Sequence, residues 1–224
     1  MKAKYLVLLL GLCIGCGNGG GGSSTSTSII PKEAPAKTIS VVDDSPAIVQ
    51  NGFVFDPTRI SDMIPIWQSQ LNEVAKAWGG NYKCNIHEGG TGDYQMIFTT
   101  TNSVSGCGPA CHTVSDNGQP VGLVNPSEGI ASGNDPLLEA AHEIDELCVD
   151  PTVDHTIENK LVEIVDPVVC WTYCEGQEIV PGKPEQDCTG DNRVPDFVFP
   201  SYYDPNGKPP YDFMNLLTKP GSHC

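Results

Sequence analysis

Cysteine content constrains the fold of this chain more than any other feature. Eight of its ten cysteines follow residue 80, in a sequence that also holds 19 prolines and 24 glycines and therefore favours long irregular segments. An even number of cysteines in an exported chain predicts a disulfide framework, here of four disulfides, although spacing does not fix the pairing. CxxxC occurs twice and CxxC does not, which argues against a zinc ribbon. The eight are Cys84, Cys107, Cys111, Cys148, Cys170, Cys174, Cys188 and Cys224.

The N-terminus has the pattern of an export signal. A basic head at 1–4 precedes an apolar run of 11 residues at 5–15, and a helix that spans a bilayer needs about 20 residues. Residues 1–15 are therefore expected to be a signal peptide. The run ends in IGC and resembles a bacterial lipobox, although Cys13 stands where leucine is more usual. This resemblance implies that Cys16 is lipidated; the alternative is a plain secretory signal with an unrelated cysteine.

A tether and one domain are expected after the signal peptide. Residues 16–38 contain a Gly/Ser/Thr-rich stretch and then prolines, which is typical of a flexible linker with a stiffer end. Residues 39–224 are long enough for a single domain with its own core. Gly17 favours the outer membrane, by resemblance to bacterial sorting rules. We expect a lipid-anchored protein of the bacterial cell envelope, at the outer membrane or the cell surface.

The charge of the chain excludes two classes of partner. Its formal net charge is −16, and loss of Lys2 and Lys4 with the signal peptide makes the mature chain −18. Such a surface repels nucleic acid and anionic lipid head groups. We therefore expect no nucleic-acid partner, and contact with the membrane through the lipid anchor only. The same charge is compatible with divalent cations.

Hydrophobic periodicity predicts two helices and several strands. Residues 60–80 place apolar side chains at three- and four-residue steps, with Pro65 expected in the first turn. Residues 134–148 begin with Asn134 or Asp135 as the cap and Pro136 at the first helical position. Strands are expected at 82–88, 93–101 and 120–125, with 161–166 and 195–200 as further candidates. This order, without a regular βαβ repeat, predicts an α+β fold.

The second expected helix contains the sequence AHEIDEL at 141–147. In the zinc-peptidase signature HExxH, two histidines bind zinc and the glutamate between them activates water. Here a glutamate replaces the second histidine. One interpretation is a solvated acidic helix face; the other is a metal site, because a cation turns repulsion among glutamates into attraction. At about 100° per residue, the residues that share this face are Glu139, His142, Glu143 and Glu146.

The segment after this helix offers a third ligand. Catalytic zinc takes three protein ligands and keeps one open position. If LVEIVD is helical, Glu163 and Asp166 share a face, and if it is a strand only one of them reaches the ion. His155 is a rival, although it stands among Asp and Thr in an expected loop. We expect His142 and Glu146 to bind the metal, with Glu163 and Asp166 as ligands or as hydrogen-bond partners of a ligand.

Three segments together resemble a group of uncharacterised bacterial and phage zincin-like proteins. They are AHEIDELCVDP, LVEIVDPV and VPDFVFPSYYDPNGKPPYDFMNLLTKP, with CHTVSDNGQPVGLV upstream, and the likeness covers about residues 94–220. It implies a zincin-like domain, in which a mixed sheet packs on an active-site helix, and a bound metal. Glu143 then occupies the position of the catalytic base. His112 is a candidate to contact substrate or to stabilise an oxyanion; the alternative is a surface-loop histidine.

The expected function is a zinc-dependent metallopeptidase that holds one ion and cuts a peptide or protein substrate. Two carboxylate ligands weaken the ion as a Lewis acid and make manganese or calcium more competitive. One alternative is a catalytically silent zincin-like surface lipoprotein that binds a metal or a protein partner, and another is a structural lipoprotein without metal. An exposed strand at 120–125 could pair with an extended peptide.

Changing Cys16 to Ser tests the anchor. If Cys16 carries the lipid, Cys16→Ser should move the protein from membrane fractions to the soluble fraction, because a signal peptide alone leaves no anchor in the mature chain. Immunoblotting of fractionated cells measures this, with Cys13→Ser as the control that keeps the anchor. Continued membrane association of Cys16→Ser would contradict lipidation.

Overall fold

The computed structural model describes residues 35–50, 52–101, 107–180, 183–184, 188 and 192–224. The expected signal peptide, Cys16 and the expected tether up to residue 34 lie outside the described residues. Among the residues that are described, no helix has both the length and the apolar character needed to cross a membrane.

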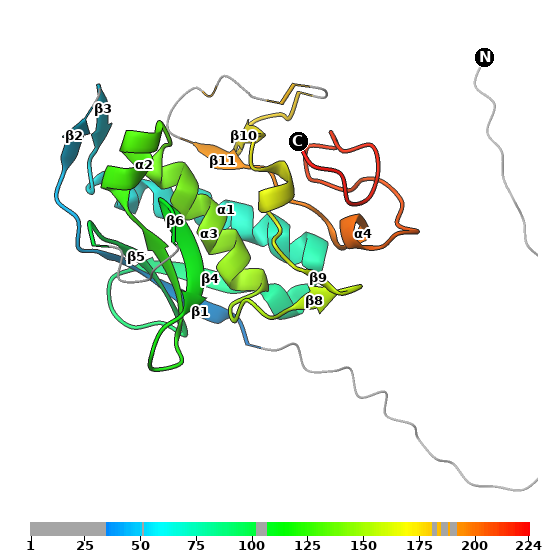
Figure 1. The fold of residues 1–224 in the computed structure, drawn as a ribbon, viewed down its shortest axis with the longest axis horizontal. Helices are drawn as coiled ribbons and strands as arrows, with labels where there is room; N and C mark the ends of the chain where they lie inside the picture. Colours follow the sequence, from blue (N-terminus) through cyan, green and yellow to red (C-terminus); the bar gives the residue numbers. More distant parts are fainter. Residues whose placement is uncertain (1–34, 51, 102–106, 181–182, 185–187, 189–191) are drawn as a thin grey trace, which may run out of the picture. The chain divides into compact units, whose positions relative to one another are not determined.

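The largest sheet among the described residues is a five-stranded mixed sheet, on which α1 (Arg59–Trp78) and α3 (Pro136–Val149) lie (Figure 1). Its strand order is β4-β1-β5-β7-β6; the first four of these are parallel to one another, and β6 is antiparallel at the edge. The α+β prediction is confirmed. The strands are β1 Lys37–Asp43, β4 Cys84–Glu88, β5 Tyr94–Phe98, β6 Ala110–Val114 and β7 Pro120–Val124.

Two of these strands were not predicted. β1 lies between β4 and β5 and buries Ile39 and Val41, yet it begins at Lys37, inside the segment expected to be tether. β6 lies between the strands expected at 93–101 and 120–125, where no strand was expected, and it folds back on β7 through a turn in which Ser115 N donates to Gln119 O at 2.9 Å. The strand expected at 120–125 as an exposed edge is therefore internal, and β6 forms the edge instead.

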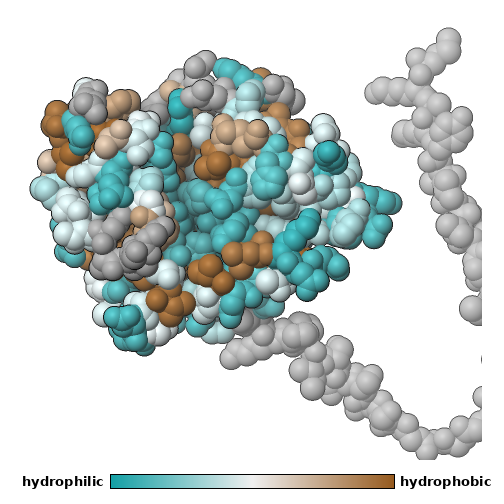
Figure 2. Space-filling view, in the orientation of Figure 1, coloured by the Kyte–Doolittle hydropathy of each residue, from teal (hydrophilic) through white to brown (hydrophobic). Residues whose placement is uncertain are grey.

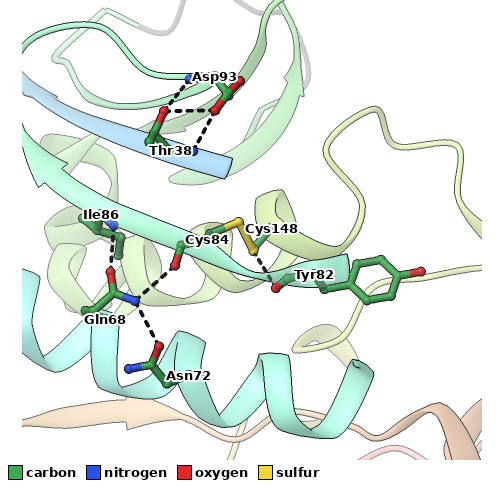
Figure 3. Close-up of a disulfide and its surroundings, with 8 residues drawn as sticks. All are labelled: Thr38, Gln68, Asn72, Tyr82, Cys84, Ile86, Asp93 and Cys148. Atoms are coloured by element: carbon green, nitrogen blue, oxygen red, sulfur yellow. Dashed lines mark hydrogen bonds between the residues drawn. A yellow bond between two sulfur atoms is a disulfide. The ribbon is translucent and has the colours of Figure 1, made fainter. Parts of the chain in front are cut away.

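Helix α1, Arg59–Trp78, confirms the first predicted helix. It packs on the sheet through Trp67 and Leu71, both fully buried. Pro65 is the seventh helical residue, so its expected place in the first turn is wrong. Figure 3 shows how α1 is fixed to β4: Gln68 Nε2 donates to Cys84 O at 3.1 Å, and Ile86 N donates to Gln68 Oε1 at 2.8 Å.

Helix α3, Pro136–Val149, confirms the second predicted helix. Asp135 is its cap, with Oδ1 accepting from Leu137 N at 2.9 Å, and Pro136 occupies the first helical position as expected. The short helix α2, Pro126–Ser132, precedes it and ends at Gly133 with a φ of 83°. α3 contacts α1, β6 and β7, and most of its residues are buried.

The chain after α3 is mostly irregular and forms a second core beside the first. Residues 161–166 are neither a helix nor one strand, because only Leu161 belongs to β9 and Asp166 begins a 3-10 turn. The candidate strand at 195–200 reduces to the end of β11 and a single bridge between Val198 and Asp212. The remaining elements are β2 Ile48–Gln50, β3 Phe53–Phe55, η1 Gly80–Tyr82, β8 Thr156–Ile157, β9 Lys160–Leu161, η2 Asp166–Val168, β10 Thr172–Cys174, β11 Arg193–Pro195 and α4 Pro200–Tyr203.

Four cysteine pairs lie at disulfide distance, as the cysteine count predicted. One of them joins β4 to the last turn of α3 (Figure 3). Two others tie down the irregular C-terminal part, and the fourth closes a short loop before β6. The pairs are Cys84–Cys148, Cys107–Cys111, Cys170–Cys224 and Cys174–Cys188.

Two fully buried carboxyl groups, Asp196 and Asp212, organise the C-terminal segment. Asp196 Oδ1 accepts from Phe197 N at 2.8 Å and from Met214 N at 3.1 Å, while Asp212 accepts from Leu216 N and Leu217 N. Burial, and then the adjacent Asp212 carboxyl, raise the pKa of Asp196 well above its ordinary value. Asp196 therefore keeps its proton in the folded chain under conditions where the unfolded chain has lost it.

This proton makes stability depend on pH. Below about pH 4, the ordinary value for aspartate, both states hold the proton; as pH rises toward the folded pKa, only the unfolded chain releases it, so the free energy of unfolding falls. Asp196→Asn keeps an oxygen acceptor and adds a donor toward Asp212. The substitution should raise the free energy of unfolding at neutral pH by about 1 kcal/mol or more. It should also make this free energy fall less steeply as the pH rises. Urea unfolding from pH 4 to 8 measures this, with the exposed Asp44→Asn as control; an unchanged slope in Asp196→Asn would contradict it.

Candidate metal centre

The HEIDE segment lies inside the protein. Relative exposure is 8% for His142, 5% for Glu143 and 2% for Glu146. The interpretation of a solvated acidic helix face is therefore wrong. Burial follows from the position of α3, which is covered by the sheet on one side and by the segment around Ile164 and Val165 on the other. Buried carboxylates need partners, because an unpaired buried charge costs several kcal/mol.

Glu146 has two sets of partners. Its Oε1 accepts hydrogen bonds from Val165 N at 3.1 Å and from Asp166 N at 3.3 Å. Its Oε2 lies 3.1 Å from His142 Nε2. Burial opposes ionisation, but the neighbouring imidazole of His142 holds the pKa of Glu146 below its ordinary value. Glu146 thus remains a carboxylate that joins α3 to the segment after β9.

Glu163 and Asp166 face different histidines. Asp166 Oδ1 lies 3.3 Å from His142 Nε2, and the side chain of Asp166 is mostly exposed. Glu163 Oε2 lies 3.9 Å from His112 Nε2 and is buried without a hydrogen-bond partner. Residues 161–166 form neither the helix nor the strand considered from the sequence. Glu163 and Asp166 nevertheless both reach the cluster, Glu163 beside His112 and Asp166 beside His142.

His112 belongs to the cluster and not to a surface loop. It stands on β6 with a side chain that is 5% exposed, and its Nδ1 lies 3.2 Å from Glu143 Oε2 and 3.5 Å from Glu146 Oε2. Burial alone would lower its pKa, but the hydrogen bond with Glu143 and the charges of Glu146 and Glu143 raise the pKa of His112 to about 9. Without a metal, His112 is therefore a cation among carboxylates.

A glycine lets α3 approach the sheet at this point. Gly122 on β7 pairs with His112 on β6. A Cβ atom at Gly122 would lie 2.6 Å from Met96 Sδ and 3.6 Å from Glu143 Cβ. A residue with a Cβ atom would therefore displace the Met96 side chain, whereas its contact with Glu143 Cβ would have an ordinary van der Waals length. The PVGLVN sequence contains this glycine, but periodicity alone does not reveal what it faces.

Three overlapping groups of side chains among the described residues could hold a metal ion. In each group the ligand atoms lie within 4.8 Å of one another. They line a cleft of about 380 Å³, and Figure 2 shows hydrophilic surface in a hollow at the centre of this face. The groups are His142/Glu146/Asp166, His112/Glu143/Glu146 and Glu139/His142/Glu143.

Other polar residues lie outside these groups or were missed. His155 stacks on Tyr82 at 6.0 Å between ring centroids and belongs to none of the three groups. Asn134, considered only as a helix cap, donates through Nδ2 to Glu139 Oε1 at 2.6 Å. Tyr203 OH donates to Glu163 O at 2.7 Å and so steadies the backbone of that acid. A contact between residues far apart in the sequence, such as Tyr203 and Glu163, produces no periodic pattern that sequence analysis could detect.

Comparison with protein-family models, with curated proteins and with solved structures found no match.

Proposed function

We propose that this chain is a metal-dependent hydrolase of peptide bonds, with a zincin-like domain and with zinc as its ion. One observation carries the proposal. His142 Nε2, Glu146 Oε2 and an Asp166 oxygen converge from α3 and the following segment, and Glu143, next to His142, is buried with a histidine partner. The mixed sheet, with β7 just before α2 and α3, fits the expected zincin-like arrangement of strand, helix and downstream acid.

The residues fit a divalent ion. One imidazole nitrogen and two carboxylate oxygens are a donor set that zinc accepts, and they leave a fourth position open. The distances of 3.1 and 3.3 Å from His142 Nε2 to the two acids suit ligands of one ion. A bound ion would polarise a carbonyl and lower the pKa of a coordinated water. Two carboxylates neutralise a divalent charge, so manganese remains a competitor.

Glu143 fits the part of the general base. Its burial raises the pKa of its carboxyl above the ordinary value, against the opposing effect of the hydrogen bond with His112. A base works best when its pKa lies near the operating pH. His112 Nδ1, 3.2 Å from Glu143 Oε2, fixes the orientation of the carboxylate. Glu143 can therefore take a proton from water and return it to the leaving amine.

The edge strand supports an extended peptide as substrate. Among the described residues, no strand pairs with the outer side of β6, because its sheet partner β7 lies on the other side. An extended peptide can add to such an edge through main-chain hydrogen bonds. His112 on β6 would place this peptide beside the cluster. The N-terminal sequence supports delivery of this activity to the cell envelope through a lipid on Cys16.

Removing His142 tests the metal. The mature wild-type chain, prepared without chelator, should retain one tightly bound divalent ion, and His142→Ala should bind it more than about 100-fold more weakly, since even hydrogen-bond partners of ligands contribute 10- to 100-fold. Mass spectrometry of metal content and zinc titration measure this. His87→Ala, a histidine on β4 outside the cluster, is the matched control and should keep the ion. A wild-type chain without metal would overturn the proposal.

Replacing Glu143 separates binding from chemistry. Glu143→Gln should retain the tight ion and lose hydrolysis of an unfolded protein by about 100-fold or more, because an amide cannot accept the proton. Glu88→Gln, an exposed change on β4, is the control for removal of a charge and should keep full activity. Full activity in Glu143→Gln would exclude Glu143 as base. Metal without hydrolysis in the wild type would favour the silent surface lipoprotein.

A further inference from the structure

One oxygen atom faces both imidazoles of the cluster. Glu146 Oε2 lies 3.1 Å from His142 Nε2 and 3.5 Å from His112 Nδ1. Its companion Oε1 is occupied by two backbone N–H groups, which fixes the orientation of the carboxylate. Glu146 therefore belongs to two ligand groups at once, one with His142 and one with His112.

The group on the His112 side has the spacing of a metal site of its own. His112 Nδ1 lies 3.2 Å from Glu143 Oε2 and 3.5 Å from Glu146 Oε2. Ligands bonded to zinc at about 2.0–2.2 Å lie roughly 3–4 Å apart around the ion. All three side chains are almost completely buried, at 3 to 6% exposure. Buried side chains with this spacing need little rearrangement to coordinate an ion.

The far nitrogen of His112 faces a carboxyl group. His112 Nε2 is buried and has no hydrogen-bond partner, and Glu163 Oε2, 3.9 Å away, is likewise buried without one. If Nδ1 binds a metal, the ring proton must be on Nε2, where Glu163 is the nearest acceptor. A carboxylate that receives the second N–H of a metal-bound histidine is a recurring partner of such ligands. An ion at Nδ1 is compatible with this arrangement, in which the Nε2 proton faces Glu163 Oε2 at 3.9 Å.

The charge of the cluster also favours a second cation. Five carboxyl groups and two imidazoles line the cleft, so the acidic groups outnumber the imidazoles. Like charges at these separations repel strongly where water is scarce. The carboxylates are Glu139, Glu143, Glu146, Glu163 and Asp166.

We propose that the centre takes a second divalent ion, bound by His112, Glu143 and Glu146, with Glu146 Oε2 shared between the two ions. The proposal rests on the first ion of the proposed function. Two metal ions bridged in this way lie about 3.5–4 Å apart in known two-metal sites. A carboxylate that binds an ion cannot accept a proton with the same electron pair. Binding of the second ion would therefore occupy Glu143 Oε2, the oxygen that faces His112, and leave only Oε1 to accept a proton.

Zinc stoichiometry of the mature chain tests the proposal. Metal-free protein is dialysed against a series of free zinc concentrations and the bound zinc is counted. The wild type should take one ion tightly and a second at higher zinc. His112→Gln should keep the tight ion and lose the second. Asp166→Ala, the matched change on the other side of Glu146, should weaken the tight ion at least 10-fold, as expected for loss of a carboxylate ligand.

The same dialysis with manganese adds a measurement that does not depend on any variant folding. Two manganese ions that share a carboxylate oxygen are magnetically coupled, so the electron paramagnetic resonance spectrum of the doubly loaded wild type should differ from that of the singly loaded form. Zero bound ions would overturn the proposed function and this proposal together. One ion at saturation, two ions with uncoupled spectra, or two ions retained in His112→Gln would overturn the second site alone.

Discussion

The position of the cluster depends on the carboxylate of Glu146. Through Oε1 it accepts two backbone N–H groups from residues 165 and 166, and through Oε2 it faces His142 and His112. One side chain therefore joins α3, β6 and the irregular segment after β9. If this carboxylate were absent, the buried N–H of Val165 would lose its acceptor, which costs about 1–3 kcal/mol, and the part-buried N–H of Asp166 would lose the bond that fixes it beside His142.

Other contacts fix the position of α3, the helix that carries Glu146. The Asp135 cap fixes the start of the helix, and the Cys84–Cys148 disulfide fixes its last turn to β4. Cys170–Cys224 ties Cys224 to the second residue after η2. Preorganised ligands bind a metal without the entropy loss of ordering flexible side chains. A chain with many prolines and glycines depends on such cross-links, since its irregular segments lack ladders of backbone hydrogen bonds.

What could be predicted from the sequence was local. Helix α3, its cap and the shared face of His142, Glu143 and Glu146 follow from spacing and cap chemistry, and the number of cysteine pairs, but not their pairing, follows from the cysteine count. β6 was missed although its partner β7 follows it directly. β1 was missed because a strand is identified by alternation over few residues, and its partners β4 and β5 are remote in the chain. For the same reason His112 could be proposed as a site residue but not placed: its neighbours come from α3 and from the segment around Glu163.

The glutamate that replaces the second histidine of HExxH has a physical reason. An imidazole offers one acceptor nitrogen, and if that nitrogen binds a metal nothing remains to accept from Val165 N and Asp166 N. A carboxylate offers two oxygens, so Glu146 can face an ion with Oε2 while Oε1 receives both N–H groups. The exchange lowers the Lewis acidity of a bound ion, because the ligand carries a negative charge. Under the proposed function, Glu146 therefore combines metal binding with attachment of the segment that carries Asp166.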